Sequence, residues 1–129
     1  MAVDIVEFNH VNVTVPREHE ESAKHFYRDV LGLEEIIKPD ASLKRGGAWY
    51  KQGPIEIHLS IEDDVQGNHQ SKRHVCYVVR DLSSAEQRFR DAGVEIIPDH
   101  RPPVPGWPRF YVRDPGGNLI EIAQRDSEN

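Results

Sequence analysis

The chain contains one cysteine, Cys76, among its 129 residues. A single cysteine can form no disulfide within the chain and cannot build a zinc site from several thiolates. Because the fold uses no disulfide, a reducing compartment such as the cytoplasm is the simplest expected location. Any metal ion that the chain holds must therefore be bound by its carboxylates and its seven histidines.

Long apolar runs and long basic runs are also missing. No apolar run approaches the roughly 20 residues that a membrane-spanning helix requires, so we expect no membrane partner. The first residues lack the basic and apolar regions of a secretory signal. The formal net charge is −6, and no run of lysine or arginine exceeds two residues. Such an acidic chain repels phosphate backbones, so a nucleic-acid partner is disfavoured.

The two halves of the chain are similar in sequence. His10 and His74 each open a valine-rich segment, and they are 64 residues apart. Gly32 and Gly93, which end the next segment of each half, are 61 residues apart, and the segment 55–59 recurs at an offset of 63. Two unrelated strand–helix units are the alternative. Three matches in one order at nearly one offset favour an internal repeat.

Each half predicts a strand, a helix and three further strands. Alternating apolar residues and turn signals predict strands at 6–15, 34–37, 48–51, 55–61, 74–79, 95–97, 109–113 and 119–124. Helical spacing predicts helices at 19–31 and 83–92, the second with a capping box formed by Ser83 and Glu86. The expected fold class is α+β, a single domain over residues 1–129. Within it, two βαβββ modules at 5–61 and 74–125 are joined by a polar connector at 62–73.

Strand side chains alternate between the two faces of a sheet, which separates apolar residues from residues with ligand chemistry. In the first strand three valines share one face, and His10 shares the other with Asn12. The valine face should pack against a helix and leave the His10 face open. By the same alternation His58 and Glu121 lie opposite to the isoleucines of their strands.

Four residues with ligand chemistry occupy equivalent positions in the repeat. His10 and His74 begin the first strand of each half, and His58 and Glu121 lie midway along the last strand. A twofold-like pairing of the halves would bring all four onto one curved face. Three imidazoles and one carboxylate suit one divalent ion, which leaves Zn, Ni, Fe, Mn and Co open. A lone histidine on a strand is most often an ordinary polar residue, and Glu56, on the face of His58, is an alternative fourth ligand.

Several short motifs carry a resemblance to a known superfamily. They are Asn9-His10-Val11, Leu31-Gly32-Leu33, Ile57-His58-Leu59, His74-Val75 and the run 109–121, of which the last is the most specific. The chain resembles the vicinal oxygen chelate proteins, which include glyoxalase I, methylmalonyl-CoA epimerase, extradiol dioxygenases, fosfomycin-resistance enzymes and bleomycin-binding proteins. The resemblance implies that two βαβββ modules form a half-open barrel around a metal site (the glyoxalase/bleomycin resistance/dioxygenase fold), and it implies a homodimer.

By position, the resemblance implies that His10, His74 and Glu121 are metal ligands and that His58 takes the fourth position. Glyoxalase I usually has glutamate there and the epimerase has glutamine, so histidine departs from both. The metal ion of such a protein chelates two neighbouring oxygens of the substrate and stabilises negative charge on them. A carboxylate, Glu121 or Glu56, is then the catalytic base that moves a proton next to the carbonyl.

The substrate pocket implied by this fold would be lined by residues of the same strands. One member of each aromatic pair, Trp49–Tyr50 and Phe110–Tyr111, should face the pocket, and the alternative is that they are core residues. Arg109 either binds an anionic group or is a solvated arginine at a strand end. Asn12 would support the ligands by hydrogen bonding. Cys76 is expected to line the pocket rather than act as a nucleophile.

The leading functional hypothesis is a glyoxalase-like, metal-dependent lyase or isomerase that acts on a small oxygenated substrate. The first alternative is an Fe(II) extradiol-type dioxygenase, because His10, His74 and Glu121 form a set of two histidines and one carboxylate. The second is a non-catalytic resistance protein that binds a small molecule or an antibiotic. Such a protein does not need four metal ligands that converge on one site, so the ligand set argues against it. The remaining histidines, His19, His25, His69 and His100, are interpreted as surface residues.

Overall fold

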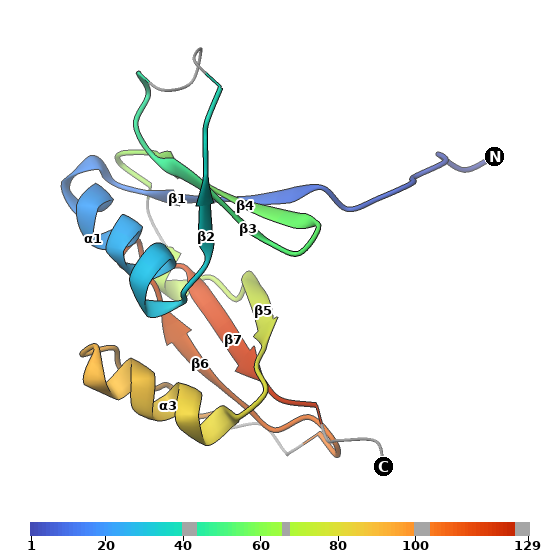
Figure 1. Cartoon of the computed structure of the whole chain (residues 1–129), viewed down its shortest axis with the longest axis vertical. Helices are drawn as coiled ribbons and strands as arrows, with labels where there is room; N and C mark the ends of the chain where they lie inside the picture. The colour runs from blue at the N-terminus through green and yellow to red at the C-terminus, as the bar shows by residue number, and fades with distance from the viewer. Residues whose placement is uncertain (40–43, 66–67, 100–103, 126–129) are drawn as a thin grey trace. The chain divides into compact units, whose positions relative to one another are not determined.

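The computed structural model of the chain describes residues 1–39, 44–65, 68–99 and 104–125. The chain forms two compact units, Met1–Asp63 and Asp64–Asn129. Each unit contains one sheet and one principal helical segment (Figure 1). This mixed content confirms the predicted α+β fold class. Of the helices in the described residues, none is long and apolar enough to cross a membrane.

The first unit is a four-stranded sheet with a helical segment between its first two strands. Strand β1 (His10–Val15) leads through a 3₁₀ turn (η1, Arg17–His19) into α1 (Glu20–His25) and a π-helical turn (η2, Phe26–Val30). Strands β2 (Glu34–Ile36), β3 (Ala48–Gln52) and β4 (Ile55–Ile61) follow. The order in the sheet is β1-β4-β3-β2. Strands β1 and β4 are parallel, and the other pairs are antiparallel.

The first strand begins later than predicted, at His10 instead of residue 6. Its ladder with β4 starts at the pair His10–Glu56, and the N–H of Glu56 donates to the carbonyl of Asn9. Before this point Val6 and Phe8 are exposed, at 87% and 63%. They lie outside the strand because β4 itself starts at Ile55 and offers them no ladder.

The second unit repeats the plan with a three-stranded sheet. A 3₁₀ turn (η3, Asn68–Gln70) precedes β5 (His74–Val78), α3 (Leu82–Asp91), β6 (Arg109–Arg113) and β7 (Leu119–Ala123). The order is β5-β7-β6, with β5 and β7 parallel and β6 antiparallel to β7.

The prediction of a strand at 95–97 is wrong. Of these three residues only Ile97 pairs, in an isolated bridge to Tyr111 that consists of two backbone hydrogen bonds. Pro98 follows directly and has no N–H with which to continue a ladder. The edge of β6 is therefore covered at one position only within the described residues.

Helix α3 begins one residue earlier than predicted, and its cap is Asp81 instead of Ser83. The Oδ1 atom of Asp81 accepts hydrogen bonds from the backbone N–H groups of Ser83 and Ser84, at 3.1 and 3.3 Å. A carboxylate at this position also interacts favourably with the helix dipole. Glu86 does not complete a capping box, because it pairs with Arg90 one turn later.

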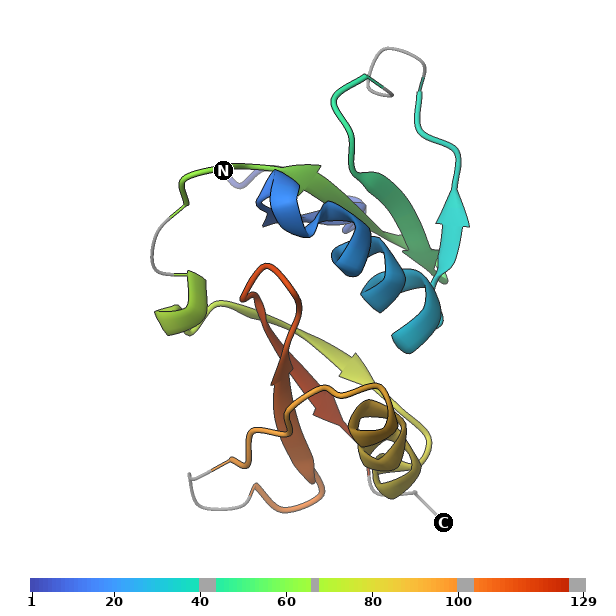
Figure 2. The same ribbon diagram turned by 90° about the vertical axis from the view of Figure 1, so that its left-hand side faces the viewer.

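One face of each sheet is covered by the helical segment of the same unit (Figure 2). In the first unit Tyr27 stacks against Tyr50 of β3, with ring centroids 5.9 Å apart. In the second, Phe89 of α3 meets Phe110 of β6 edge to face at 6.0 Å. All four side chains are buried. The opposite face of each sheet is therefore the one available for polar side chains.

The chain enters β3 through two glycines in the left-handed conformation, Gly46 (φ +77°) and Gly47 (φ +80°). The N–H of Gly47 donates to Oε2 of Glu20 in α1 at 2.9 Å. A Cβ at Gly47 would lie 2.0 Å from the carbonyl oxygen of Leu59 in β4. These contacts hold the segment before β3 against both the helix and the sheet.

We expect Gly47→Ala to destabilise the protein more than Gly53→Ala, which is the matched control. Gly53 also has a positive φ (+57°), but a Cβ there would meet nothing within 4 Å. The left-handed conformation costs alanine about 1 kcal/mol at either position. The clash with Leu59 adds about 2 kcal/mol at Gly47 alone. Urea unfolding followed by circular dichroism measures the free energy of unfolding of both variants. Equal losses of stability would contradict the close approach of Gly47 to Leu59.

Candidate functional site

The parallel strand pairs bring the candidate ligands together within each unit. In the β1–β4 ladder, His58 pairs with the residue two positions after His10. In the β5–β7 ladder, Glu121 pairs with the residue two positions after His74. Side chains two positions apart share a face. Each unit therefore places one pair of candidate ligands, His10–His58 or His74–Glu121, on the sheet face opposite its helix.

In the first unit the ring of His58 is held between two nearly parallel rings. The His10 ring lies 4.1 Å away by centroid with 13° between the planes, and the Trp49 ring lies 3.8 Å away at 1°. The Nε2 atom of His58 lies 2.8 Å from Oε1 of Glu56. The His58 side chain is 11% exposed. Stacking and this bond together fix its position.

In the second unit the carboxylate of Glu121 is surrounded by polar side chains and is 7% exposed. Its Oε1 atom lies 3.1 Å from Nε2 of His74 and accepts a hydrogen bond from the Tyr111 hydroxyl at 3.3 Å. Its Oε2 atom accepts from the Trp107 indole at 2.8 Å and from the Cys76 thiol at 3.4 Å. A guanidinium nitrogen of Arg109 lies 3.9 Å from the same oxygen.

These partners keep the Glu121 carboxylate ionised. Burial by itself would raise the pKa of Glu121, but the hydrogen bonds from Trp107 and Cys76 and the charges of Arg109 and His74 lower that pKa overall. The same contact has the opposite effect on the thiol. Burial and the adjacent Glu121 charge raise the pKa of Cys76 to about 11. Cys76 therefore acts as a thiol donor, because a nucleophile would need the thiolate.

The rings of His10 and His74 are oriented in the same way through their Nδ1 atoms. Nδ1 of His10 lies 2.8 Å from Oδ1 of Asn9, and Nδ1 of His74 lies 2.9 Å from the carbonyl oxygen of Lys72. A carbonyl oxygen only accepts, so Nδ1 carries the hydrogen in each bond. In the neutral ring the lone pair is then on Nε2, the arrangement found in many metal-binding histidines.

The contact between His74 and Glu121 tests whether these residues fit a metal ion. Because Nδ1 of His74 donates to Lys72, the Nε2 lone pair of the neutral ring faces a carboxylate oxygen at 3.1 Å. Two electron pairs at this distance repel each other, and a metal ion that accepts both pairs would relieve this repulsion. Imidazole and carboxylate groups are suitable ligands for a first-row divalent ion.

The stacked rings of the first unit constrain the fourth ligand. An imidazole binds a metal ion through a lone pair in the plane of its ring. Two nearly parallel rings 4.1 Å apart share no plane, so His10 and His58 cannot bind one ion while they are stacked. Either one ring turns when a metal ion binds, or Glu56, which is 32% exposed on the same face, takes the fourth position.

Within the described parts of the chain, no group of three or more His, Cys, Asp or Glu side chains lies close enough to hold a metal ion. The candidate ligands occur as one pair in each unit. The four-ligand site is therefore a proposal that rests on these two pairs and on their equivalent registers.

The structure separates the predicted pocket aromatics into two classes. Trp49 pairs with His58 across the β3–β4 ladder, and Tyr111 pairs with Glu121 across the β6–β7 ladder. Both therefore lie on the ligand face of their sheet, which is the face that carries the candidate ligands. Tyr50 and Phe110 lie on the opposite faces, in the cores beneath the helices, and are not pocket residues. The sequence alone left this choice open, because it does not give the register of either hairpin.

The other predicted residues lie beside the ligands. Oδ1 of Asn12 accepts a hydrogen bond from the Ser60 hydroxyl at 2.6 Å. Arg109 is 13% exposed and donates to Asp99 at 2.6 Å, so it is not a solvated arginine at a strand end. Sequence reasoning missed Trp107 and Asp99. Both belong to the proline-rich segment after α3, where no periodic pattern indicates which side chains point toward the sheet.

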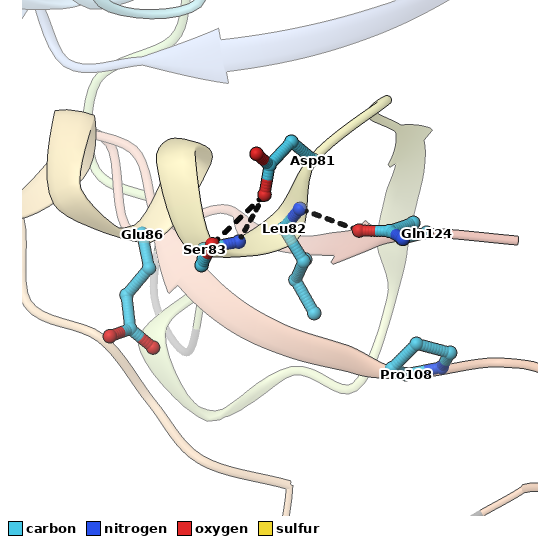
Figure 3. A pocket seen from close by; sticks show the side chains of 6 residues that line it. All are labelled: Asp81, Leu82, Ser83, Glu86, Pro108 and Gln124. Carbon is cyan, nitrogen blue, oxygen red and sulfur yellow. Dashed lines mark hydrogen bonds between the residues drawn. The ribbon is translucent and has the colours of Figure 1, made fainter. Parts of the chain in front are cut away.

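A pocket of about 470 Å³ lies at the N-terminus of α3 (Figure 3). Two of its polar side chains already accept hydrogen bonds from the backbone of α3. Asp81 caps it, and Oε1 of Gln124 accepts a hydrogen bond from the N–H of Leu82 at 2.7 Å. This pocket includes none of the four candidate ligands.

The fold and the repeated ligand positions agree with a family assignment. Residues 7–122 match the model of the Glyoxalase/Bleomycin resistance protein/Dioxygenase superfamily. The chain belongs to this superfamily, which confirms the resemblance to vicinal oxygen chelate proteins.

Individual relatives extend the comparison. A solved glyoxalase family protein from Bacillus anthracis is 37% identical and has a TM-score of 0.84, with 98% of this chain and all of that chain (100%) covered. The ethylmalonyl-CoA/methylmalonyl-CoA epimerase of Cereibacter sphaeroides is 27% identical over 90% of this chain and 96% of its own. A lactoylglutathione lyase from Agrobacterium tumefaciens, 22% identical with a TM-score of 0.69 over 94% of this chain and 95% of its own, shares the fold.

Replacing Trp107 with Phe removes the indole donor from Glu121 and keeps an aromatic ring. We expect the pKa of Glu121 to rise, because the Trp107 hydrogen bond is the largest of the contributions that lower it. Carbon-13 NMR of the Glu121 carboxyl during a pH titration of metal-free protein measures this. Tyr77→Phe is the control, because Tyr77 lies on the opposite face of β5 from Cys76. An unchanged pKa in W107F would contradict the proposed contact.

Proposed function

We propose that the protein is a metal-dependent enzyme of the lyase or isomerase type, which chelates two neighbouring oxygens of a small substrate. His10, His74 and Glu121 would bind one divalent ion, with the fourth position taken by His58 or Glu56. The observation that carries the proposal is that both units present a ligand pair at the same ladder register. The Nδ1 contacts of His10 and His74 support it, because each leaves the lone pair of the neutral ring on Nε2 for a metal ion.

A bound divalent ion would polarise the chelated oxygens and stabilise the negative charge that forms when a neighbouring proton leaves. Two carboxylates of the chain would then have different roles, one as a metal ligand and the other as the base. Glu121 has partners on both carboxylate oxygens, which suits a ligand better than a base. Glu56 is more exposed and lies 2.8 Å from Nε2 of His58, which supports a role as the base that would accept a proton from the substrate.

The similarity to the epimerase of Cereibacter sphaeroides supports an isomerase in particular. Its name states an epimerase that acts on ethylmalonyl-CoA and methylmalonyl-CoA. Epimerisation removes and returns one proton beside a carbonyl, which is the chemistry that a chelated oxyanion and a carboxylate base would catalyse. We therefore propose proton transfer at a carbon next to a carbonyl as the reaction.

The first test is metal analysis. Repleted protein should hold about one equivalent of divalent ion per chain. His10→Ala, His74→Ala and Glu121→Ala should each weaken binding by about 100-fold or more. His25→Ala is the control, because this exposed imidazole pairs with Asp29 on the helical segment. No bound metal after repletion, or affinities unchanged by the His10 and His74 variants, would contradict the proposal.

The second test is exchange of substrate protons with solvent. Metal-loaded protein in D₂O should place deuterium at the carbon between the two carbonyl groups of methylmalonyl-CoA. Glu56→Gln should slow the exchange by about 100-fold. If its metal affinity is unchanged, Glu56 is the base, and if that affinity falls it is a ligand. Glu62→Gln, an exposed carboxylate just after β4, is the control. Equal rates in E56Q and the native protein would rule out Glu56 as the base.

One observation favours a second candidate. While His58 is stacked, the remaining candidate ligands His10, His74 and Glu121 would supply the two-histidine, one-carboxylate set of Fe(II) dioxygenases. Oxygen uptake on catechols by the Fe(II)-loaded protein, without proton exchange, would select this alternative over the isomerase.

A further inference from the structure

A pocket of about 310 Å³ opens in the first unit beside His58. Asn12, His58 and Ser60 line it from the sheet, together with the indole of Trp49. Lys38 and Arg45 line it from the two described ends of the connection between β2 and β3. The pocket therefore combines neutral hydrogen-bonding groups and a flat ring with two cationic side chains.

The two cationic groups are not neutralised in the described residues. Neither Lys38 nor Arg45 forms an ion pair there, although the chain as a whole carries a net charge of −6. Glu20 is near enough to interact with Lys38, but its carboxylate is already bonded to the Gly47 N–H at 2.9 Å and to Lys24 at 3.1 Å. Burial and the charge of Arg45 lower the pKa of Lys38. An unbalanced positive charge lining a cavity is a binding feature for an anion.

The backbone holds both cations at the pocket. Gly46 and Gly47 follow Arg45 directly, and the close approach of Gly47 to Leu59 fixes where this segment meets the sheet. The ammonium group of Lys38 donates to the carbonyl oxygen of Gly46. One of its three N–H groups is used in this way, so others remain for a ligand.

We propose that this pocket binds an anionic group of the substrate, a carboxylate or a phosphate, between Lys38 and Arg45. The remainder of the substrate then extends past Trp49 toward His58 and Asn12 on the ligand face. This inference names the substrate class of the proposed enzyme and rests on that proposal. Selection for anions would arise because a neutral substrate leaves these two cations without a counter-charge from the described part of the chain.

Binding of small probe anions to metal-free protein tests the proposal without any catalytic step. Acetate and inorganic phosphate should shift the ¹H–¹⁵N NMR signals of Gly46 and the Trp49 indole in a saturable way, whereas acetamide should not. The tighter of the two anions identifies the preferred group. Lys38→Gln and Arg45→Gln should each weaken binding by about tenfold. Lys38→Arg, which keeps the charge, should retain binding.

Lys44→Gln is the matched control, because Lys44 is an exposed lysine of the same turn that does not line the pocket. An equal loss of affinity in K44Q and R45Q would overturn the proposal, since it would show a general effect of net charge. Equal shifts with acetate and acetamide, or no saturable shift at Gly46 and Trp49, would also overturn it. Because the protein contains no metal in these titrations, such a failure is distinct from a failure of metal binding or proton exchange.

Discussion

The parallel pairing of the first and last strands in each unit is the constraint on which the other features depend. Parallel neighbours require a crossover, and the helical segment that crosses covers one sheet face with apolar side chains. The other face is left for His10 and His58 in one unit and for His74 and Glu121 in the other. Since side chains alternate, a shift of one residue in either ladder would turn the side chain of His58 or Glu121 toward the core.

Much of this arrangement could be predicted from the sequence, because it depends on period and repeat. Alternation in residues 10–15 and 55–61 is enough to place His10 and His58 opposite the core. The choice between Trp49 and Tyr50 depends on hairpin register, which is set by the turn between β3 and β4 and has no apolar pattern of its own. Trp107 lies in an irregular segment where neither period applies. The predicted strand at 95–97 does not form, although its residues favour a strand. The next residue, Pro98, has no backbone N–H with which to continue a ladder.

The two units place different chemistry at equivalent positions. Trp49 and Tyr111 are the ladder partners of the last-strand ligands, and one stacks on an imidazole while the other donates a hydroxyl to a carboxylate. The first unit therefore holds the His58 ring by ring contacts, and two cationic side chains line its pocket. The second holds a stabilised negative charge. The two halves of the repeat therefore carry an imidazole in one unit and a carboxylate in the other at the same ladder position.

The partners of Glu121 have a consequence for how this site changes over evolutionary time. An imidazole, a thiol, an indole, a phenol and a guanidinium all contact this one carboxylate. They come from separate strands and from the irregular segment before β6, so no single loop controls the carboxylate. Losing any one of these contacts leaves several others around the carboxylate. We expect such redundancy to keep the buried negative charge stabilised when the irregular segment before β6 changes in sequence, because the partners from β5 and β6 remain.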